Sequence, residues 1–130
     1  VLLLGRPIAS VADLAPAAQA LLGLGAPAVL LKGGHLPGEQ VLDVLAIAGQ
    51  PPRLLQDARI ATPNLHGAGC TLSSAIAAQL ALGLDLPAAV QAARSYVRQA
   101  LAAGAKVRTG QGVGPLNHGF APLPTRLGAL

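Results

Sequence analysis

The single cysteine of the chain lies where a glycine-containing turn leads into an apolar segment, in the stretch HGAGCTLSSAIAAQLAL of residues 66–82. A helix beginning at Thr71 would leave Gly67, Ala68, Gly69 and Cys70 in the turn that enters it. Backbone N–H groups in such a turn have no intrahelical acceptor, and the helix dipole adds partial positive charge. Because glycine lets a phosphate approach the backbone closely, this turn is a candidate anion hole.

Cys70 has two interpretations at this stage. A thiol at a helix N-terminus gains thiolate character, so Cys70 could act as a base or as a nucleophile. A free cysteine is also among the most buried residue types, and Gly-x-Gly before a helix is often only a tight turn. The turn contains neither the phosphate-binding pattern GxxxxGK[ST] nor a complete GxGxxG. Spacing alone therefore favours the packing interpretation, and a phosphate site needs a second support.

Lys32 could supply that support, because it follows the apolar run of a predicted strand in LLKGGH. Ligands of open α/β sheets collect at the carboxyl ends of strands, where a lysine can reach phosphate oxygens. A solvated surface lysine explains the same pattern equally well.

The remaining polar candidates carry weaker signals. His35 and His66 are typical of surface or turn histidines, and without nearby carboxylates they make a poor metal site, so we assign no metal ligand. Asp43, within the run VLD, could be catalytic or could be a charge on an edge strand.

The order of the predicted elements indicates an α/β fold. Residues 14–25 have helical composition and end in glycines, and residues 28–34 form an apolar run typical of a strand buried on both faces in a parallel sheet. Further elements follow without a visible domain boundary: strands at 41–49 and 53–62, helices at 71–83 and 86–104, and a Gly/Pro-rich tail at 106–130. We expect the tail to be a loop that lines a site, or to be partly disordered.

Composition limits the classes of function. A chain of 130 residues with 52% apolar residues can form one globular domain, although it starts at Val1 and lacks methionine, so we expect a fragment. The net charge of +4 favours anionic partners, but scattered arginines and few aromatics argue against nucleic acid. One cysteine cannot form an internal disulfide, so a reducing cytoplasm is expected. Prolines, glycines and polar residues interrupt the uncharged stretches 14–31 and 60–84, so neither is expected to span a membrane.

Four blocks of the sequence resemble the C-terminal half of the hydroxymethylpyrimidine and phosphomethylpyrimidine kinases of thiamine biosynthesis, a branch of the ribokinase-like family. The resemblance covers nearly the whole chain, and its most specific part is HGAGCTLS. The blocks are LLKGGHL (30–36), LDVLAIAG (42–49) with IATPNLHGAGCTLSSAIAAQLALGL (60–84), AVQAARSYVRQAL (89–101) and GVGPLNH (112–118).

The resemblance implies a ribokinase-like three-layer α/β sandwich, of which residues 1–130 would form the C-terminal, nucleotide-side part of one kinase domain, with the N-terminal half absent. It implies an enzyme that uses ATP and Mg²⁺ to phosphorylate 4-amino-5-hydroxymethyl-2-methylpyrimidine and then its monophosphate. We expect a cytoplasmic homodimer that binds these small molecules and neither nucleic acid nor membrane. We also expect that the 130 residues alone do not turn over the pyrimidine.

The resemblance assigns roles to residues of this chain. Cys70 would stand where the catalytic base takes the hydroxyl proton, Lys32 would hold phosphates, and the anion hole would consist of Gly67, Ala68, Gly69 and the Cys70 amide. The residues implied around the nucleotide are Thr62, Asn64, His66 and Asn117. Two positions depart from the usual pattern, since Leu65 and Ala68 stand where threonine is common. Most of the wider ribokinase group has aspartate in place of Cys70.

Three alternatives remain open. The chain could belong to a truncated kinase remnant that binds a nucleotide or a partner without catalysis. It could belong to another vitamin kinase of the same fold, such as a pyridoxal kinase. A thiol enzyme would use Cys70 as a covalent nucleophile, with His66 as the nearest candidate base in the sequence.

Overall fold

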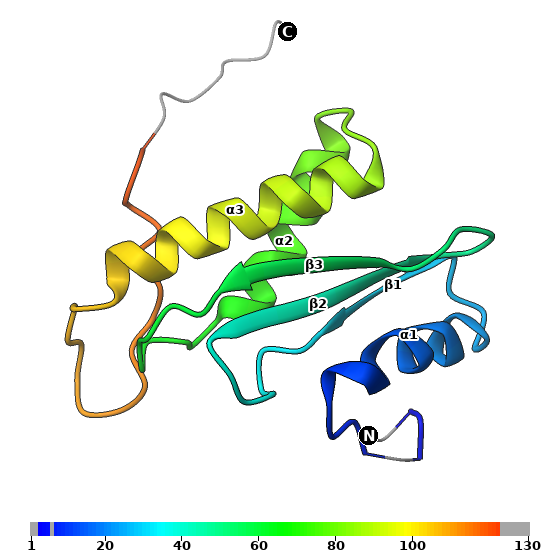
Figure 1. The fold of residues 1–130 in the computed structure, drawn as a ribbon. Coiled ribbons are helices and arrows are strands. Elements are labelled where there is room, and N and C mark those ends of the chain that lie inside the picture. The colour runs from blue at the N-terminus through cyan, green and yellow to red at the C-terminus, as the bar shows by residue number, and fades with distance from the viewer. Residues whose placement is uncertain (1–2, 6, 123–130) are drawn as a thin grey trace, which may run out of the picture. The chain divides into compact units, whose positions relative to one another are not determined.

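The computed structural model describes residues 3–5 and 7–122, and its chain divides between Arg59 and Ile60 into two compact units. The first unit contains a short 3-10 helix η1 (Val11–Asp13), helix α1 and three strands, and the second contains helices α2 and α3. Figure 1 follows this order along the chain. The predicted sequence of one helix, three strands and two helices is therefore confirmed, and the fold is α/β.

Helix α1 (Leu14–Leu22) begins and ends at local signals. The Asp13 carboxylate accepts N–H bonds from Ala9 at 3.1 Å and Ser10 at 2.9 Å, which fixes the turn before the helix. The N–H of Gly23 closes the last turn on the carbonyl of Gln19. The helix is thus shorter than the predicted 14–25, because the residues from Gly23 onward form the turn that leads to β1.

The sheet of the first unit is antiparallel throughout. Its order is β1 (Ala28–Lys32), β2 (Gln40–Ile47), β3 (Arg53–Ala58), and both neighbouring pairs are antiparallel. The prediction of a parallel, doubly buried strand at 28–34 is wrong: β1 is only partly buried. Parallel neighbours need a crossover of about a dozen residues or more, and the connection 33–39 is too short for one. An apolar run does not reveal the direction of its neighbour.

The two faces of β2 carry different residues. Val44 and Ala46 belong to a buried cluster that Leu14 and Ala18 of α1 complete, and Figure 1 shows α1 beside these strands. Asp43 alternates to the opposite face, where it pairs in register with Lys32. Asp43 is only 3% exposed and β2 is the central strand, so the interpretation of Asp43 as an edge-strand charge is wrong.

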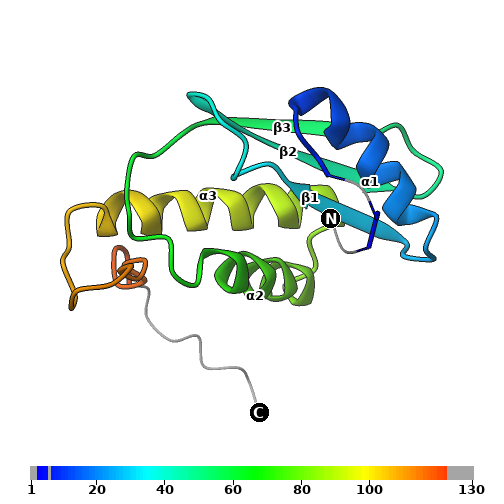
Figure 2. The same cartoon turned by 90° about the horizontal axis from the view of Figure 1, so that it is seen from below.

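The second unit is built on a helical hairpin. Helix α2 (Ala68–Ala81) and helix α3 (Leu86–Gly104) lie side by side and run in opposite directions, as Figure 2 shows. The bounds of α3 match the predicted 86–104: Asp85 caps it by accepting the Ala88 N–H at 2.9 Å, and Pro87 lies in its first turn. Helix α2 begins three residues before the predicted Thr71.

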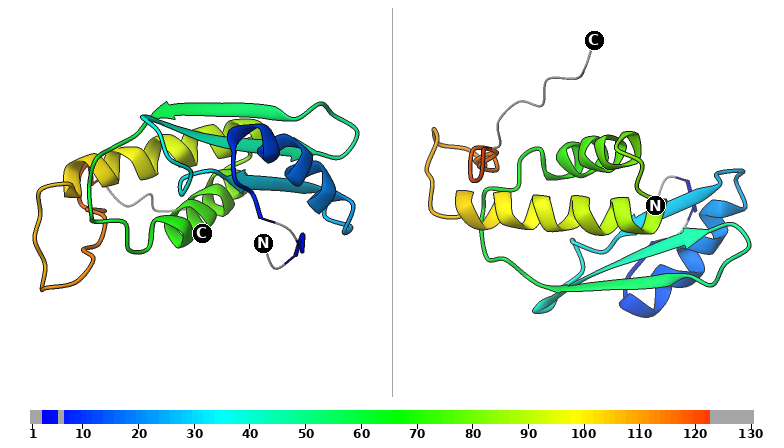
Figure 3. Two further views of the ribbon diagram at one scale, coloured as in Figure 1. Left: turned by 60° about the horizontal axis from the view of Figure 1, so that its bottom comes forward. Right: turned by 90° about the horizontal axis from the view of Figure 1, so that it is seen from above.

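The segment after α3 turns back toward the residues that precede α2 (Figure 3). The His66 N–H donates to the Gly114 carbonyl at 3.2 Å, and His66 and Pro115 form an isolated parallel bridge. The Asn117 N–H donates to the Ala100 carbonyl at 3.1 Å. The predicted loop is confirmed over the described part of the tail, and residues 123–130 lie outside the described residues.

No helix within the described ranges combines the length and apolar character needed to cross a bilayer.

Candidate functional site

The first turn of α2 is the geometric centre of the candidate site. Gly67 is the N-cap, with a left-handed φ of 83°, and the helix starts at Ala68. Gly69 and Cys70 therefore lie inside the first helical turn, where N–H groups have no intrahelical acceptor. The Ala68 N–H donates to the Leu65 carbonyl at 3.2 Å, and the Thr71 N–H to the Gly67 carbonyl at 2.8 Å. The turn thus presents chiefly the N–H groups of Gly69 and Cys70 to an anion.

The two glycines of this turn serve different purposes. Position 67 requires glycine for its backbone conformation, because residues with a side chain rarely adopt the positive φ found there. Gly69 has no positive φ, and a Cβ built there meets nothing within 4 Å. Internal packing therefore does not require glycine at position 69, but a ligand that approaches the backbone would.

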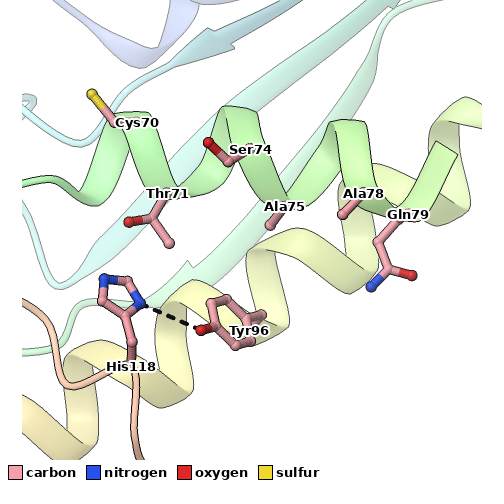
Figure 4. Close-up of a pocket in the computed structure, with 8 residues that line it drawn as sticks. All are labelled: Cys70, Thr71, Ser74, Ala75, Ala78, Gln79, Tyr96 and His118. Carbon is pink, nitrogen blue, oxygen red and sulfur yellow. Dashed lines mark hydrogen bonds between the residues drawn. The ribbon is translucent and has the colours of Figure 1, made fainter. Parts of the chain in front are cut away.

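Cys70 is exposed, so the interpretation of a buried packing cysteine is wrong. Cys70 is also one of the residues that line a pocket with a volume of about 510 Å³ that runs along α2. In Figure 4 the Sγ atom points away from His118, whereas Thr71 lies on the side of α2 that faces it. The residues that line the pocket are Cys70, Thr71, Ser74, Ala75, Ala78, Gln79, Tyr96 and His118.

An aromatic cluster forms the wall of the pocket opposite α2. The rings of Tyr96 and His118 stack with centroids 6.2 Å apart at 17°, and Tyr96 Oη lies 3.3 Å from His118 Nδ1. The ring of Phe120 also contacts Tyr96, with centroids 5.3 Å apart and a tilt of 51°. Sequence reasoning missed Tyr96 and His118 as site residues. The available signal was that GVGPLNH ends at His118 and that Tyr96 is the chain's one tyrosine.

The predicted nucleotide residues before α2 serve as structural ties in this structure. Thr62 Oγ1 accepts the N–H of Asn64 at 3.0 Å. Asn64 is 5% exposed, and its Nδ2 donates to the carbonyls of Gly104 at 2.7 Å and Val107 at 2.6 Å. His66 is exposed. Direct contact of Thr62, Asn64 or His66 with a nucleotide stays a prediction.

Asn117 lies next to the pocket residue His118. Its Oδ1 accepts the Gly119 N–H at 3.0 Å, which shapes the turn that carries His118. His118 from the tail and Cys70 from the first turn of α2 line the same pocket. The structure thus brings the tail near Asn117 close to the start of α2. A nucleotide contact of Asn117 itself stays a prediction.

Lys32 belongs to the first unit, where it is the exposed last residue of β1. The next residue, Gly33, is buried and donates its N–H to Asp43 Oδ1 at 3.0 Å. A Cβ on Gly33 would collide with the carbonyl oxygen of Leu42, so the backbone after Lys32 lies very close to β2. His35 is exposed in the same connection.

The described part of the chain offers no group of three or more His, Cys, Asp or Glu side chains that could hold a metal ion. Mg²⁺ is commonly held by one or two carboxylates together with substrate phosphates. A magnesium ion held in that way would need no such group, and which residues of this chain contact it stays untested.

Comparison with known proteins identifies relatives of this chain. The family model described as phosphomethylpyrimidine kinase matches residues 1–117. A hydroxymethylpyrimidine/phosphomethylpyrimidine kinase of Rhizobium meliloti is 48% identical over 90% of this chain and 44% of its own length. One from Synechococcus elongatus is 48% identical over 94% of this chain and 45% of its own length. The chain thus spans about half the length of these curated relatives.

Solved structures show the same fold. An ADP complex of Bacillus subtilis pyridoxal kinase superposes with a TM-score of 0.80 at 35% identity, covering 88% of this chain and 42% of that one. The Staphylococcus aureus pyridoxal kinase in complex with AMP-PCP superposes with a TM-score of 0.78 at 34% identity, covering 89% of this chain and 41% of that one. These matches confirm the ribokinase-like α/β class. The sequence match over residues 1–117 places the chain in the phosphomethylpyrimidine kinase family.

Proposed function

We propose that the protein containing this chain transfers the γ-phosphoryl group of ATP to the hydroxymethyl group of 4-amino-5-hydroxymethyl-2-methylpyrimidine, and then phosphorylates the resulting monophosphate. One observation carries the proposal: in a chain of this family, the first turn of α2 opens onto a pocket of about 510 Å³. The 48% identity to kinases described by these two substrates supports the choice of substrate.

The proposed placement of ATP follows the charge along α2. Phosphate oxygens would accept bonds from the N–H groups of Gly69 and Cys70, where the helix dipole is positive. The nucleoside would extend along the pocket toward Gln79, past the wall formed by Tyr96 and His118. Neighbouring structures that hold ADP and AMP-PCP support the use of a nucleotide.

Catalysis in this proposal depends mainly on positioning and on stabilisation of developing phosphoryl charge. Fixed amides at the start of α2 would stabilise that charge without reorganising. Cys70 would accept the proton of the attacking hydroxyl, and the exposure of Cys70 is compatible with that role. Lys32 would neutralise phosphate charge from the end of β1. Mg²⁺ would arrive with the phosphates, and no step is assigned to it on residues of this chain.

A pyridoxal kinase is the second candidate, because several structural neighbours carry that name. Their identity to this chain is 35% and 34%, below the 48% of the pyrimidine kinases, so the pyrimidine is the preferred acceptor. We further propose a cytoplasmic homodimer. Size-exclusion chromatography with light scattering tests the dimer, and fractionation of cells tests the location.

The deciding experiment is an ATP-dependent phosphorylation assay on the full-length protein with the pyrimidine, its monophosphate and pyridoxal as separate acceptors. Preferred turnover of the two pyrimidines supports the proposal, and preferred turnover of pyridoxal replaces it with the second candidate. Nucleotide binding without turnover of any acceptor would identify a non-catalytic remnant. The 130 residues alone should turn over neither pyrimidine.

A further inference from the structure

The connection between β1 and β2, residues 33–39, is held by the side chain of Arg59, the residue directly after β3. Arg59 donates from Nε to the Gly38 carbonyl at 2.7 Å, from Nη1 to the Gly34 carbonyl at 2.8 Å and from Nη2 to the Leu36 carbonyl at 2.6 Å. The Arg59 backbone N–H adds a bond to the Glu39 carbonyl at 2.7 Å. One residue thus engages alternate carbonyls across most of the connection.

A second anchor fixes the start of the same connection. The buried Asp43 carboxylate accepts the Gly33 N–H at 3.0 Å, and the Leu36 N–H closes a turn on the Gly33 carbonyl at 2.9 Å. Lys32 immediately precedes this anchor, and His35 lies inside the turn. Any shift of the turn would therefore change where Lys32 leaves the strand.

The chemistry of Arg59 suits this task better than phosphate binding. A guanidinium is a planar fork of donors in fixed directions, and bonds from a charged donor are stronger than neutral ones. Each of its three nitrogens donates one N–H to the connection, so the fork is oriented toward these backbone carbonyls. The connection contains Gly33, Gly34 and Gly38, whose backbone freedom would make it mobile without such a clamp.

We propose that Arg59 is a positioning residue: it fixes the connection 33–39 and thereby holds Lys32 in place for phosphoryl transfer. The effect on Lys32 rests on the proposed function, whereas the effect on the connection does not. Arg59 acts through the backbone and does not touch the phosphates.

The test compares Arg59→Ala, Arg59→Lys and the control Arg53→Ala in the full-length protein. Arg53 is an exposed arginine at the start of β3, so the control removes the same charge from the opposite end of that strand. Hydrogen exchange at the Leu36 amide should become about tenfold faster or more in both Arg59 variants, since that amide is protected only while the turn is closed. It should stay unchanged in Arg53→Ala.

Kinetics then separate positioning from direct binding. Both Arg59 variants should lower kcat by about 10- to 100-fold, since small misplacements of reacting groups cost that much, and the KM for ATP should change less than kcat. A lysine cannot replace the fork, so Arg59→Lys should resemble Arg59→Ala. A lysine variant with wild-type kcat, alongside an alanine variant with a raised KM for ATP, would identify a phosphate ligand and overturn the proposal. Unchanged exchange at Leu36 would also overturn it.

Failure of the proposed function gives a different result. In that case the wild-type protein phosphorylates none of the acceptors, while the exchange experiment still decides whether Arg59 holds the connection. Loss of Leu36 protection with unchanged kcat in an active enzyme would refute the link to catalysis.

Discussion

Asn64 donates its side-chain N–H to the backbone carbonyl of Gly104 at 2.7 Å, which joins the loop before α2 to the C-terminal end of α3. A second N–H bond from the same amide, to the Val107 carbonyl at 2.6 Å, extends the tie into the tail. Gly114 passes so close that a Cβ there would collide with Asn64 Oδ1. One buried amide thus holds together three segments that border the pocket and the first turn of α2.

Replacing Asn64 with alanine should lower the free energy of unfolding by about 1–3 kcal/mol, because one buried and one partly buried carbonyl lose their donor. Urea unfolding followed by circular dichroism measures this. Asn117→Ala is the matched control, since its side chain bonds only to the nearby Gly119 N–H among the contacts described, and it should change stability by less than about 0.5 kcal/mol. Equal effects of the two substitutions would contradict a bracing role for Asn64.

The glycines at the start of α2 should separate stability from binding. Gly67→Ala should destabilise the protein by roughly 1–2 kcal/mol, because φ at this position is 83°. Gly69→Ala should leave stability unchanged or raise it by up to about 1 kcal/mol, since alanine favours a helix. Gly69→Ala should nevertheless weaken ATP binding, because its methyl group stands where a phosphate would approach. Calorimetric titration with ATP and thermal unfolding measure the two effects, and normal ATP affinity in Gly69→Ala would argue against the proposed phosphate position.

Cys70→Ala should lower turnover much more than nucleotide affinity, by roughly 10²-fold or more, as expected for loss of a general base. The measurements are kcat and the dissociation constant of ADP. Cys70→Ser distinguishes the chemistry, since serine keeps a polar group of similar size. Unchanged turnover in both variants would remove the base role, and trapping of a covalent substrate adduct on Cys70 would instead support a thiol enzyme.

Lys32→Ala should lower kcat/KM for ATP by about a hundredfold if Lys32 stabilises phosphate charge. Lys106→Ala, at the other lysine of the chain, removes the same charge from an exposed position in the tail and should have little effect. Steady-state kinetics at varied ATP measure both. Similar losses in the two variants would show a general effect of net charge instead of a site at the end of β1.

Tyr96→Ala should raise the KM for ATP by about tenfold, because the pocket loses the ring that stacks on His118, and such aromatic contacts contribute roughly 0.5–1.5 kcal/mol beyond buried area. Tyr96→Phe keeps the ring and should retain most of the affinity. Ser95→Ala, one residue earlier on α3, serves as the control. A KM unchanged by Tyr96→Ala would place the nucleoside elsewhere.

The sequence by itself determined the order of the elements, the bounds of α3 and the family. These depend on local information: Asp85, Pro87 and Gly104 delimit α3 through caps and backbone preferences within a few residues. The turn HGAGC was also identified as a candidate anion site from glycine content and its position before a helix. The exact start of α2 was not determined by the sequence, because the left-handed Gly67 lets the helix begin three residues before Thr71.

Only the tertiary structure decided the antiparallel direction of β1, the exposure of Cys70 and the partners of Arg59. A buried strand and a partly buried one have similar apolar runs, and direction follows from which strand the chain can reach after a short connection. The Arg59 clamp joins residues 21 to 25 positions apart, and the Tyr96–His118 stack joins residues 22 apart. Such contacts depend on how separate elements pack against one another, and the local periodicity of the sequence does not predict that packing.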